Sequence, residues 1–120
     1  MPTPNDMLKD RLSRYSDISI GVIGRKSGRA ITNTVWFVFE DDTINLLPVQ
    51  GSDTQWYKNV LQNPAIQVSA RGAEAKLQAA ILTEPKQVAS VIEKFRTKYG
   101  AADVKKYYSK FDVAVLVRLR

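Results

Sequence analysis

DISIGVIGRKSGRAITNTVWFVFE, residues 17–40, is the stretch that decides the fold. Residues 17–24 alternate with a period of two, and residues 30–40 are rich in β-branched and aromatic side chains, a pattern typical of β-strands. Between these segments lie Gly28, a serine and three cations, and Gly24 ends the first segment, a composition that favours a tight turn. The stretch therefore predicts a β-hairpin with a strongly basic turn.

The rest of the chain predicts four further strands and three helices. The expected strands are 44–49, 65–71, 75–82 and 112–119, and the expected helices lie within 5–15, 52–64 and 83–100. Residues 102–111 are expected to be a polar connection. Because six mainly antiparallel strands in a small chain leave exposed edges unless the sheet closes, we expect a barrel. The predicted organisation is one mainly β domain over residues 1–120 with flanking helices, of which residues 1–16 form the first.

The composition excludes several classes of protein. The chain has 120 residues, of which 44% are hydrophobic and 25% charged, as is usual for a globular domain. It contains no cysteine, so disulfides and thiol chemistry are excluded. It contains no histidine, which removes the usual general base and the commonest metal ligand. We therefore expect neither a metal site nor a Ser-His-Asp triad.

The sequence also indicates where in the cell the protein is located. The N-terminus, MPTPNDMLKD, lacks the apolar core of a signal peptide, and no apolar run approaches the roughly 20 residues of a membrane helix. We expect a cytoplasmic protein with no transmembrane segment.

The net charge is +6, and residues 86–110 hold seven Lys or Arg against two acids. This surface is either a solvated helix face or, alternatively, a nucleic-acid-binding face, and the former is the commoner arrangement.

The basic turn, Gly24–Arg29, has two interpretations. It can be an ordinary charged hairpin, or its glycines, backbone N–H groups and cations can hold a phosphate. It matches neither a Walker A loop nor a Rossmann fingerprint. Downstream, Gly51 and Ser52 precede a helix N-terminus that can receive an anion.

Aromatic residues supply the remaining candidates. Strand alternation places Trp36 with Thr34 on one face of 30–40, as a flat wall with a polar edge, whereas Val35 and Phe37 face the core. Tyr107 and Tyr108 carry phenols that can donate a proton to a substrate, or they can be packing anchors. A phosphate grip, a flat wall and tyrosines without a metal ligand suit a flavin-like cofactor.

The blocks GRKSGRAITNTVWFV and GSDTQWYKNVLQNP together resemble the deazaflavin-dependent nitroreductase and quinone reductase family, within the superfamily of flavin-binding split β-barrels. The likeness runs from about residue 17 to the end of the chain. It implies a six-stranded antiparallel split β-barrel and the reduced deazaflavin coenzyme F(420) as cofactor. Thr34 stands where many relatives have proline, and Trp36 stands where tyrosine is frequent.

The resemblance also implies roles for residues. The basic loop would meet the phosphate and polyglutamate tail, residues 33–36 would line the deazaflavin, residues 49–52 would hold the ring or ribityl group, and the helix would support the site. The implied cofactor-binding residues are Arg25, Lys26, Ser27, Gly28, Arg29, Asn33, Thr34, Val35, Trp36, Val49, Gln50, Gly51, Ser52, Trp56 and Asn59. The implied catalytic residues, at the substrate, are Tyr107, Tyr108 and Trp36.

We therefore expect an oxidoreductase that passes a hydride from the reduced deazaflavin to a small quinone, enone or nitroaromatic. A tyrosine or solvent would supply the proton. The alternatives are a split barrel that binds FMN, another flavin or a tetrapyrrole, and a basic nucleic-acid-binding barrel. No nucleic-acid partner is expected under the first interpretation, and a homodimer is possible because split barrels often pair.

Overall fold

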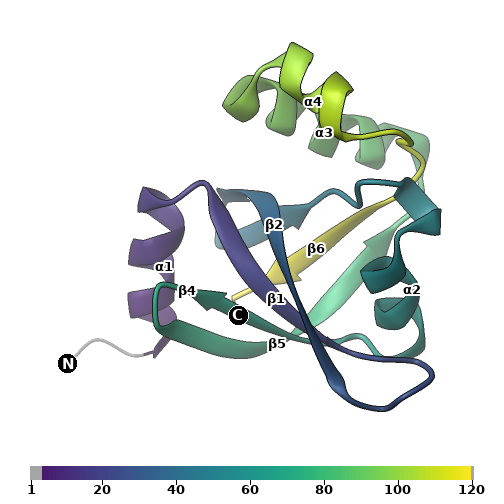
Figure 1. The fold of residues 1–120 in the computed structure, drawn as a ribbon. Helices are drawn as coiled ribbons and strands as arrows, with labels where there is room; N and C mark the ends of the chain where they lie inside the picture. The colour runs from purple at the N-terminus through teal and green to yellow at the C-terminus, as the bar shows by residue number, and fades with distance from the viewer. Residues whose placement is uncertain (1–3, 120) are drawn as a thin grey trace.

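The computed structural model describes residues 4–119, so residues 1–3 and 120 of the expected domain lie outside it. Six strands form a closed barrel in the order β1-β2-β3-β6-β5-β4, every neighbouring pair is antiparallel, and four helices flank it (Figure 1). The strands are β1 Asp17–Ile23, β2 Ala30–Glu40, β3 Thr43–Leu46, β4 Ala65–Ala70, β5 Ala73–Leu82 and β6 Ala114–Arg118. The helices are α1 Pro4–Arg14, α2 Gln55–Gln62, α3 Pro85–Tyr99 and α4 Ala101–Tyr107, with a 3-10 turn at Gly51–Asp53. The predicted mainly β barrel with flanking helices is confirmed.

The two long strands change partners midway along their length. The first seven residues of β2 pair with β1, and from Phe37 onward β2 pairs with β3. In the same way β5 pairs with β4 as far as Gln78 and with β6 from Ala79. These changes divide the barrel into two half-sheets that share β2 and β5, which is the split of the barrel.

Where β2 changes partners, side chains from α3 supply hydrogen bonds to backbone groups that have no strand partner. The Tyr99 hydroxyl oxygen accepts the N–H of Phe37 at 3.0 Å, and its single O–H has two acceptors within reach, the carbonyl oxygens of Phe37 at 2.7 Å and Ser16 at 2.6 Å from the phenol oxygen. The Lys98 ammonium also donates to the Phe37 carbonyl, at 2.7 Å. Burial raises the pKa of Tyr99 to about 12 and lowers the pKa of Lys98. These bonds satisfy backbone groups that β1 no longer reaches.

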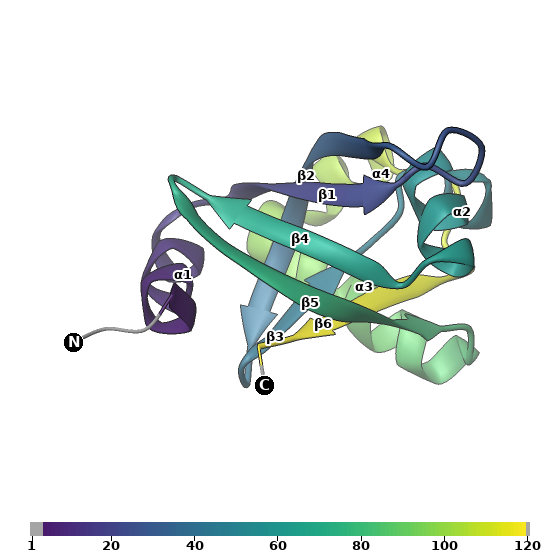
Figure 2. The same cartoon turned by 90° about the horizontal axis from the view of Figure 1, so that it is seen from below.

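Alternating side chains fill the barrel, as the period-two pattern predicts. Ile18, Ile20 and Val22 of β1 point inward and are at most 2% exposed. Leu8 and Leu12 of α1 cover one end of this core, and Trp56, Tyr57 and Val60 of α2 cover the other (Figure 2). A second apolar cluster lies outside the barrel, where α3 and α4 cover β2 and the start of β6.

Several boundaries differ from the prediction by one to three residues, and one helix was missed. β3 ends at Leu46 and β6 begins at Ala114, so both are shorter than expected. α4 occupies much of the segment that was expected to be an irregular connection. The only signal was the spacing of Val104, which is buried in α4, and Tyr108, which is buried directly after the helix, because the other residues of this segment are mostly polar or small.

Among residues 4–119, none of the helices combines the length and the apolar character that crossing a bilayer requires.

Candidate functional site

The basic hairpin turn is closed by its own hydrogen bonds. Gly24 donates to the Arg29 carbonyl and accepts from Gly28, both at 2.8 Å, while the Ser27 hydroxyl oxygen accepts the Arg29 N–H at 3.2 Å. Gly28 has a φ of +69°, which favours glycine. Within residues 4–119, only the N–H groups of Lys26 and Ser27 in this turn have no protein acceptor. The turn therefore offers an anion mainly its side chains, with few backbone donors.

A recess of about 320 Å³ lies between this turn, β2 and the start of α2. We call it the basic recess, and it is lined by Gly24, Arg25, Lys26, Ser27, Ile31, Asn33, Gln55, Trp56 and Asn59. No carboxylate is among these residues. A Cβ on Gly24 would lie 2.7 Å from the Ser27 hydroxyl and 2.9 Å from the Ile31 side chain, so glycine allows the turn to fold tightly here. The recess lies at the turn for which the sequence allows two interpretations, a charged hairpin and a phosphate-binding loop.

The cations of the turn differ in what they contact. Arg25 donates to Asn59 and Gln55 of α2. The side chains of Lys26 and Arg29 contact no acceptor or carboxylate in the described part of the chain. Charge-assisted hydrogen bonds to phosphate or carboxylate are the strong interactions available to such groups. The donor set therefore fits the anionic tail of a deazaflavin coenzyme.

Not all of the residues expected along β2 face the recess. Asn33 lines it, whereas the partly buried Val35 packs against the barrel core. Thr34 lies on the outer face, in a small polar hollow beside Ser19 and Ser69. The period of two separates neighbouring residues onto opposite faces, so residues 33–36 do not act as one wall.

Trp36 lies in an aromatic cluster that connects β2 to α3 and α4. Its indole stacks on Tyr99 with ring centroids 4.3 Å apart, and it meets Tyr107 edge-on at 5.4 Å and Tyr108 at 6.1 Å. All three residues expected at the substrate are thus brought together. They differ in access: the side chain of Tyr107 is 52% exposed, whereas Tyr108 is 5% exposed. Burial raises the pKa of Tyr108, which fits a packing role better than proton donation.

The recess and the aromatic cluster are neighbours along β2. Asn33 lines the recess and Trp36 belongs to the cluster, three residues later. At about 3.3 Å per residue, the two positions are roughly 10 Å apart along the strand. Because this separation is odd, strand alternation places the two side chains on opposite faces of β2, so a ligand does not contact both along a single face of the strand.

The segment 49–53 is joined to the chain that precedes β6. Ser52 donates its N–H to Asp112 at 2.9 Å and its hydroxyl to the other carboxylate oxygen at 2.5 Å. Lys110 bridges Asp112 and Asp53, and Gln50 pairs in parallel with Lys110. Partial burial tends to raise the pKa of Asp112, but the Ser52 hydrogen bonds and the Lys110 charge outweigh it, so this pKa is lowered.

This arrangement changes the interpretation of Gly51 and Ser52. The anion at this short helical turn is the carboxylate of Asp112, so both Ser52 donors are already used. Gly51 is buried with a φ of +55°, and a Cβ there would collide with that carboxylate. Val49 and Gln50 are exposed, so of the four predicted cofactor-binding residues in this segment these two remain the most accessible to a ligand.

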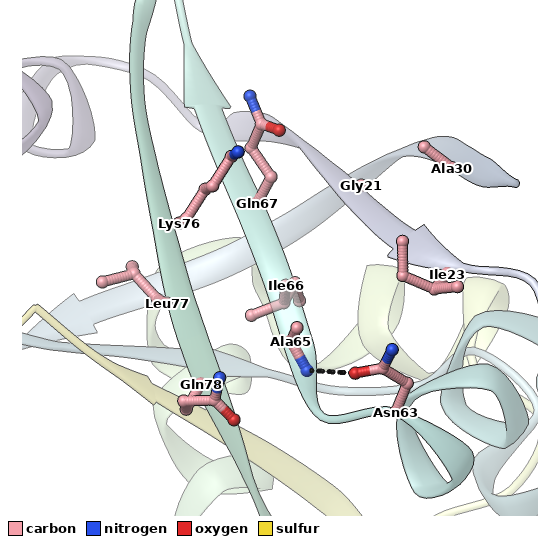
Figure 3. A pocket seen from close by; sticks show the side chains of 10 residues that line it. All are labelled: Gly21, Ile23, Ala30, Asn63, Ala65, Ile66, Gln67, Lys76, Leu77 and Gln78. Atoms are coloured by element: carbon pink, nitrogen blue, oxygen red, sulfur yellow. Dashed lines mark hydrogen bonds between the residues drawn. The ribbon is translucent and has the colours of Figure 1, made fainter. Parts of the chain in front are cut away.

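A larger hollow of about 560 Å³ lies on the outer face of β1, β4 and β5 (Figure 3). Small residues such as Gly21, Ala30 and Ala65 line it, with Lys76 as the one cation of its lining. The Asn63 side chain accepts the Ala65 N–H at 3.1 Å, as the dashed line in Figure 3 marks. This hollow lacks the concentration of cations that an anionic coenzyme needs, which leaves the basic recess as the better candidate.

The basic segment 86–110 is largely engaged within the molecule. Lys94 lies 4.0 Å from Glu40, Arg96 pairs with Glu93, and Lys98 donates to the backbone of Phe37. Lys110 is held by two aspartates, which raise its pKa through the Asp53 hydrogen bond and the charges of both carboxylates. A surface with so many internal partners favours a packed and solvated helix face over a nucleic-acid-binding one.

Three contributors were missed in the sequence. Gln55 contacts Arg25, Asp112 holds Ser52, and Tyr99 covers Trp36. Only Gln55 had a usable signal, because it lies four residues before Asn59 and so shares its helix face.

Comparisons with known proteins agree with this geometry. The model of a family described as F420H(2)-dependent quinone reductase matches residues 8–120. No curated protein matches the chain. Among solved structures, an F420-H2 dependent reductase (FDR-A) has a TM-score of 0.67 at 18% identity, covering 86% of this chain and 94% of its own.

Two further structures share the fold at low identity. A protein described as a domain-swapped dimer has a TM-score of 0.68 at 18% identity, covering 97% of this chain and 100% of its own. HutZ, a heme storage protein from Vibrio cholerae, has a TM-score of 0.70 at 12% identity, and the match covers 93% of this chain and 87% of HutZ. At these identities the likeness is one of fold.

Proposed function

The chain belongs to the F420H(2)-dependent quinone reductase family and is an enzyme that uses reduced coenzyme F(420), and we propose that it reduces a small quinone by hydride transfer from this cofactor. Enones and nitroaromatics come second in this proposal, since both also accept a hydride at an electron-poor atom. When bound, the reduced deazaflavin supplies a hydride from its ring carbon, and a quinone that takes up this hydride and one proton becomes a hydroquinone.

One observation supports this function above the others: the recess beside β2 is lined by Arg25 and Lys26 and by no carboxylate, so it suits a coenzyme with an anionic tail. In the proposal, Lys26 and Arg29 bind the phosphate and polyglutamate tail, and Arg25 adds a fixed positive charge. Asn33 and Trp56 line the basic recess beside these cations. The exposed Val49 and Gln50 contact the ring or ribityl portion of the cofactor.

At the other end, the aromatic cluster orients the electrophile. Tyr99 covers one face of the Trp36 indole, so Trp36 offers a ligand its remaining surface. The exposed Tyr107 is the proposed proton donor, with solvent as the alternative. We assign Tyr108 and Ser52 to packing and to holding Asp112.

The test is a fluorescence titration of the purified protein with coenzyme F(420), followed by oxidation of the reduced coenzyme with a soluble benzoquinone. We expect saturable binding and loss of reduced coenzyme that depends on the protein. FMN is the matched control, because it shares the flat ring and phosphate but lacks the polyglutamate tail. Tight FMN binding with no binding of F(420) would overturn the proposal, and bound flavin would be visible in the absorbance of the purified protein.

A haem ligand would give a Soret band in the same absorbance scan. The usual histidine and cysteine axial ligands are not available, because the chain contains neither residue. The fold shared with a heme storage protein therefore does not by itself favour haem here.

We also propose that the enzyme is cytoplasmic and forms a homodimer. The dimer is supported by the domain-swapped dimer among the structures that share its fold. Sedimentation velocity at micromolar concentration measures it, and a single species at the monomer mass of 13.5 kDa would contradict it.

A further inference from the structure

Arg25 is held by hydrogen bonds to two amide side chains of α2. The Asn59 carbonyl oxygen accepts both the backbone N–H of Arg25, at 3.1 Å, and its guanidinium Nη1, at 2.8 Å. The Gln55 carbonyl oxygen accepts from Nη2 at 2.8 Å. We infer that Gln55 and Asn59 are positioning residues that fix Arg25 while leaving its charge available to the coenzyme, an inference that rests on the proposed function.

The positions of the two amides on α2 explain why both can hydrogen-bond Arg25. They are four residues apart on α2, so they lie on the same face of the helix. Asn59 is buried at 4% exposure, and Gln55 is exposed at the edge of the basic recess. Together they hold the first residue of the turn at its backbone and at its side chain. The guanidinium is therefore oriented before a ligand arrives, which reduces the ordering cost of binding.

The neutrality of the amides is the second part of the argument. A guanidinium has five N–H donors, and the structure uses two of these for the amide pair. An amide oxygen orients a cation without cancelling its charge, whereas a carboxylate forms an ion pair. Four other arginines of this chain are paired with carboxylates: Arg11 and Arg14 with Asp10, Arg71 with Asp17 and Arg96 with Glu93. In the basic recess the arginine contacts neutral amides instead of carboxylates, so its positive charge is not neutralised by an ion pair.

This inference predicts an order of effects that a purely structural role would reverse. Gln55→Glu keeps, and even strengthens, the contact with Arg25 but neutralises the charge. Gln55→Ala loses the contact but keeps the charge. If the amides serve to present a charged Arg25, the glutamate variant binds the anionic coenzyme more weakly than the alanine variant. If they serve only to hold the loop, the alanine variant is the weaker.

The experiment measures the Kd of coenzyme F(420) by fluorescence for wild type, Gln55→Ala and Gln55→Glu. We expect an increase of a few fold for Gln55→Ala and of at least about tenfold for Gln55→Glu. Gln62→Glu is the matched control, since it makes the same charge change at an exposed position on the same helix outside the recess. It should change Kd by less than about twofold. Melting temperatures show whether all variants are folded.

The same series is titrated with inorganic pyrophosphate, detected by the rise in melting temperature, to separate two kinds of failure. Failure of the wild type to bind F(420) overturns the proposed function, while the order of the variants toward pyrophosphate still tests the amide pair. A Gln55→Glu variant that binds either probe as tightly as Gln55→Ala overturns the inference. So does a wild type that binds neither probe.

Discussion

The ring of Tyr99 stacks on the indole of Trp36 with planes inclined by 8°, and its hydroxyl bonds the backbone of Phe37, the next residue. One side chain of α3 thus covers the proposed aromatic wall and also closes the split in β2. Tyr99 therefore contributes both to the proposed substrate site and to the stability of the barrel, and substitutions at Tyr99 should affect both.

Tyr99→Phe should destabilise the fold by about 1–2 kcal/mol at neutral pH, because backbone groups of Phe37 lose a partner. It should also flatten the alkaline pH dependence of unfolding. The pKa of Tyr99 is about 12 in the folded protein against 10.0 ordinarily, so the unfolded chain loses this proton first as pH rises. The resulting stabilisation is complete below pH 10 and disappears by pH 12.

Urea denaturation between pH 9 and 12 measures this effect. The wild type should lose up to about 2 kcal/mol more than Tyr99→Phe over this range. The exposed tyrosine variant Tyr15→Phe is the control and should follow the wild type. Equal alkaline slopes for wild type and Tyr99→Phe would show that the hydroxyl is not buried as described.

Tyr107→Phe should lower turnover with a quinone by about tenfold or more, since it removes the accessible phenol next to Trp36. Its melting temperature should stay unchanged. Tyr108→Phe is the matched variant, and its turnover should remain within about twofold because that phenol is buried. Steady-state kinetics at saturating coenzyme measures both, and the reverse ranking would move the proton donor to Tyr108.

Lys26→Ala and Arg29→Ala should each weaken coenzyme binding by about tenfold, because each removes one charge-assisted contact. Neither variant should lower the melting temperature, since neither side chain bonds another described residue. Lys86→Ala, at an exposed position at the start of α3, is the control. Equal Kd values for all three variants would place the anion elsewhere.

Gly51→Ala should be markedly more destabilising than Gly72→Ala. Both glycines have positive φ, +55° and +88°, so both substitutions incur about 1–2 kcal/mol of backbone strain. Only at Gly51 would the new Cβ also collide with Asp112, whereas at Gly72 it meets nothing within 4 Å. Chemical denaturation compares the two, and losses that agree within about 0.5 kcal/mol would mean that Asp112 moves aside at little cost.

Local patterns in the sequence were sufficient for most of the fold. Period-two alternation gave β1 and β2, and Pro85 and Gly100 lie at the predicted ends of α3. The basic turn was located correctly because glycines and charges are themselves local signals. Closure into a barrel also followed from local information, through the need to remove exposed strand edges.

Contacts between distant residues could not be predicted in this way. The carboxylate that Ser52 holds comes from Asp112, 60 positions later, and the phenol that covers Trp36 comes from Tyr99. No periodicity reports such pairs, because they depend on how α3 and α4 lie on the barrel. Strand alternation did place Thr34 and Asn33 on opposite faces of β2, but the hollow that each one lines is completed by residues distant in the sequence.

β6 lies between β3 and β5, although it follows all the other strands in the chain. During synthesis, the first five strands can pair, but the barrel stays open until residues 114–118 have left the ribosome. For that interval β3 and the second half of β5 present unpaired edges, the kind of surface to which chaperones and other nascent chains bind. Closure of the barrel therefore waits for the last of its six strands, and the five residues of β6 decide when these two edges are covered.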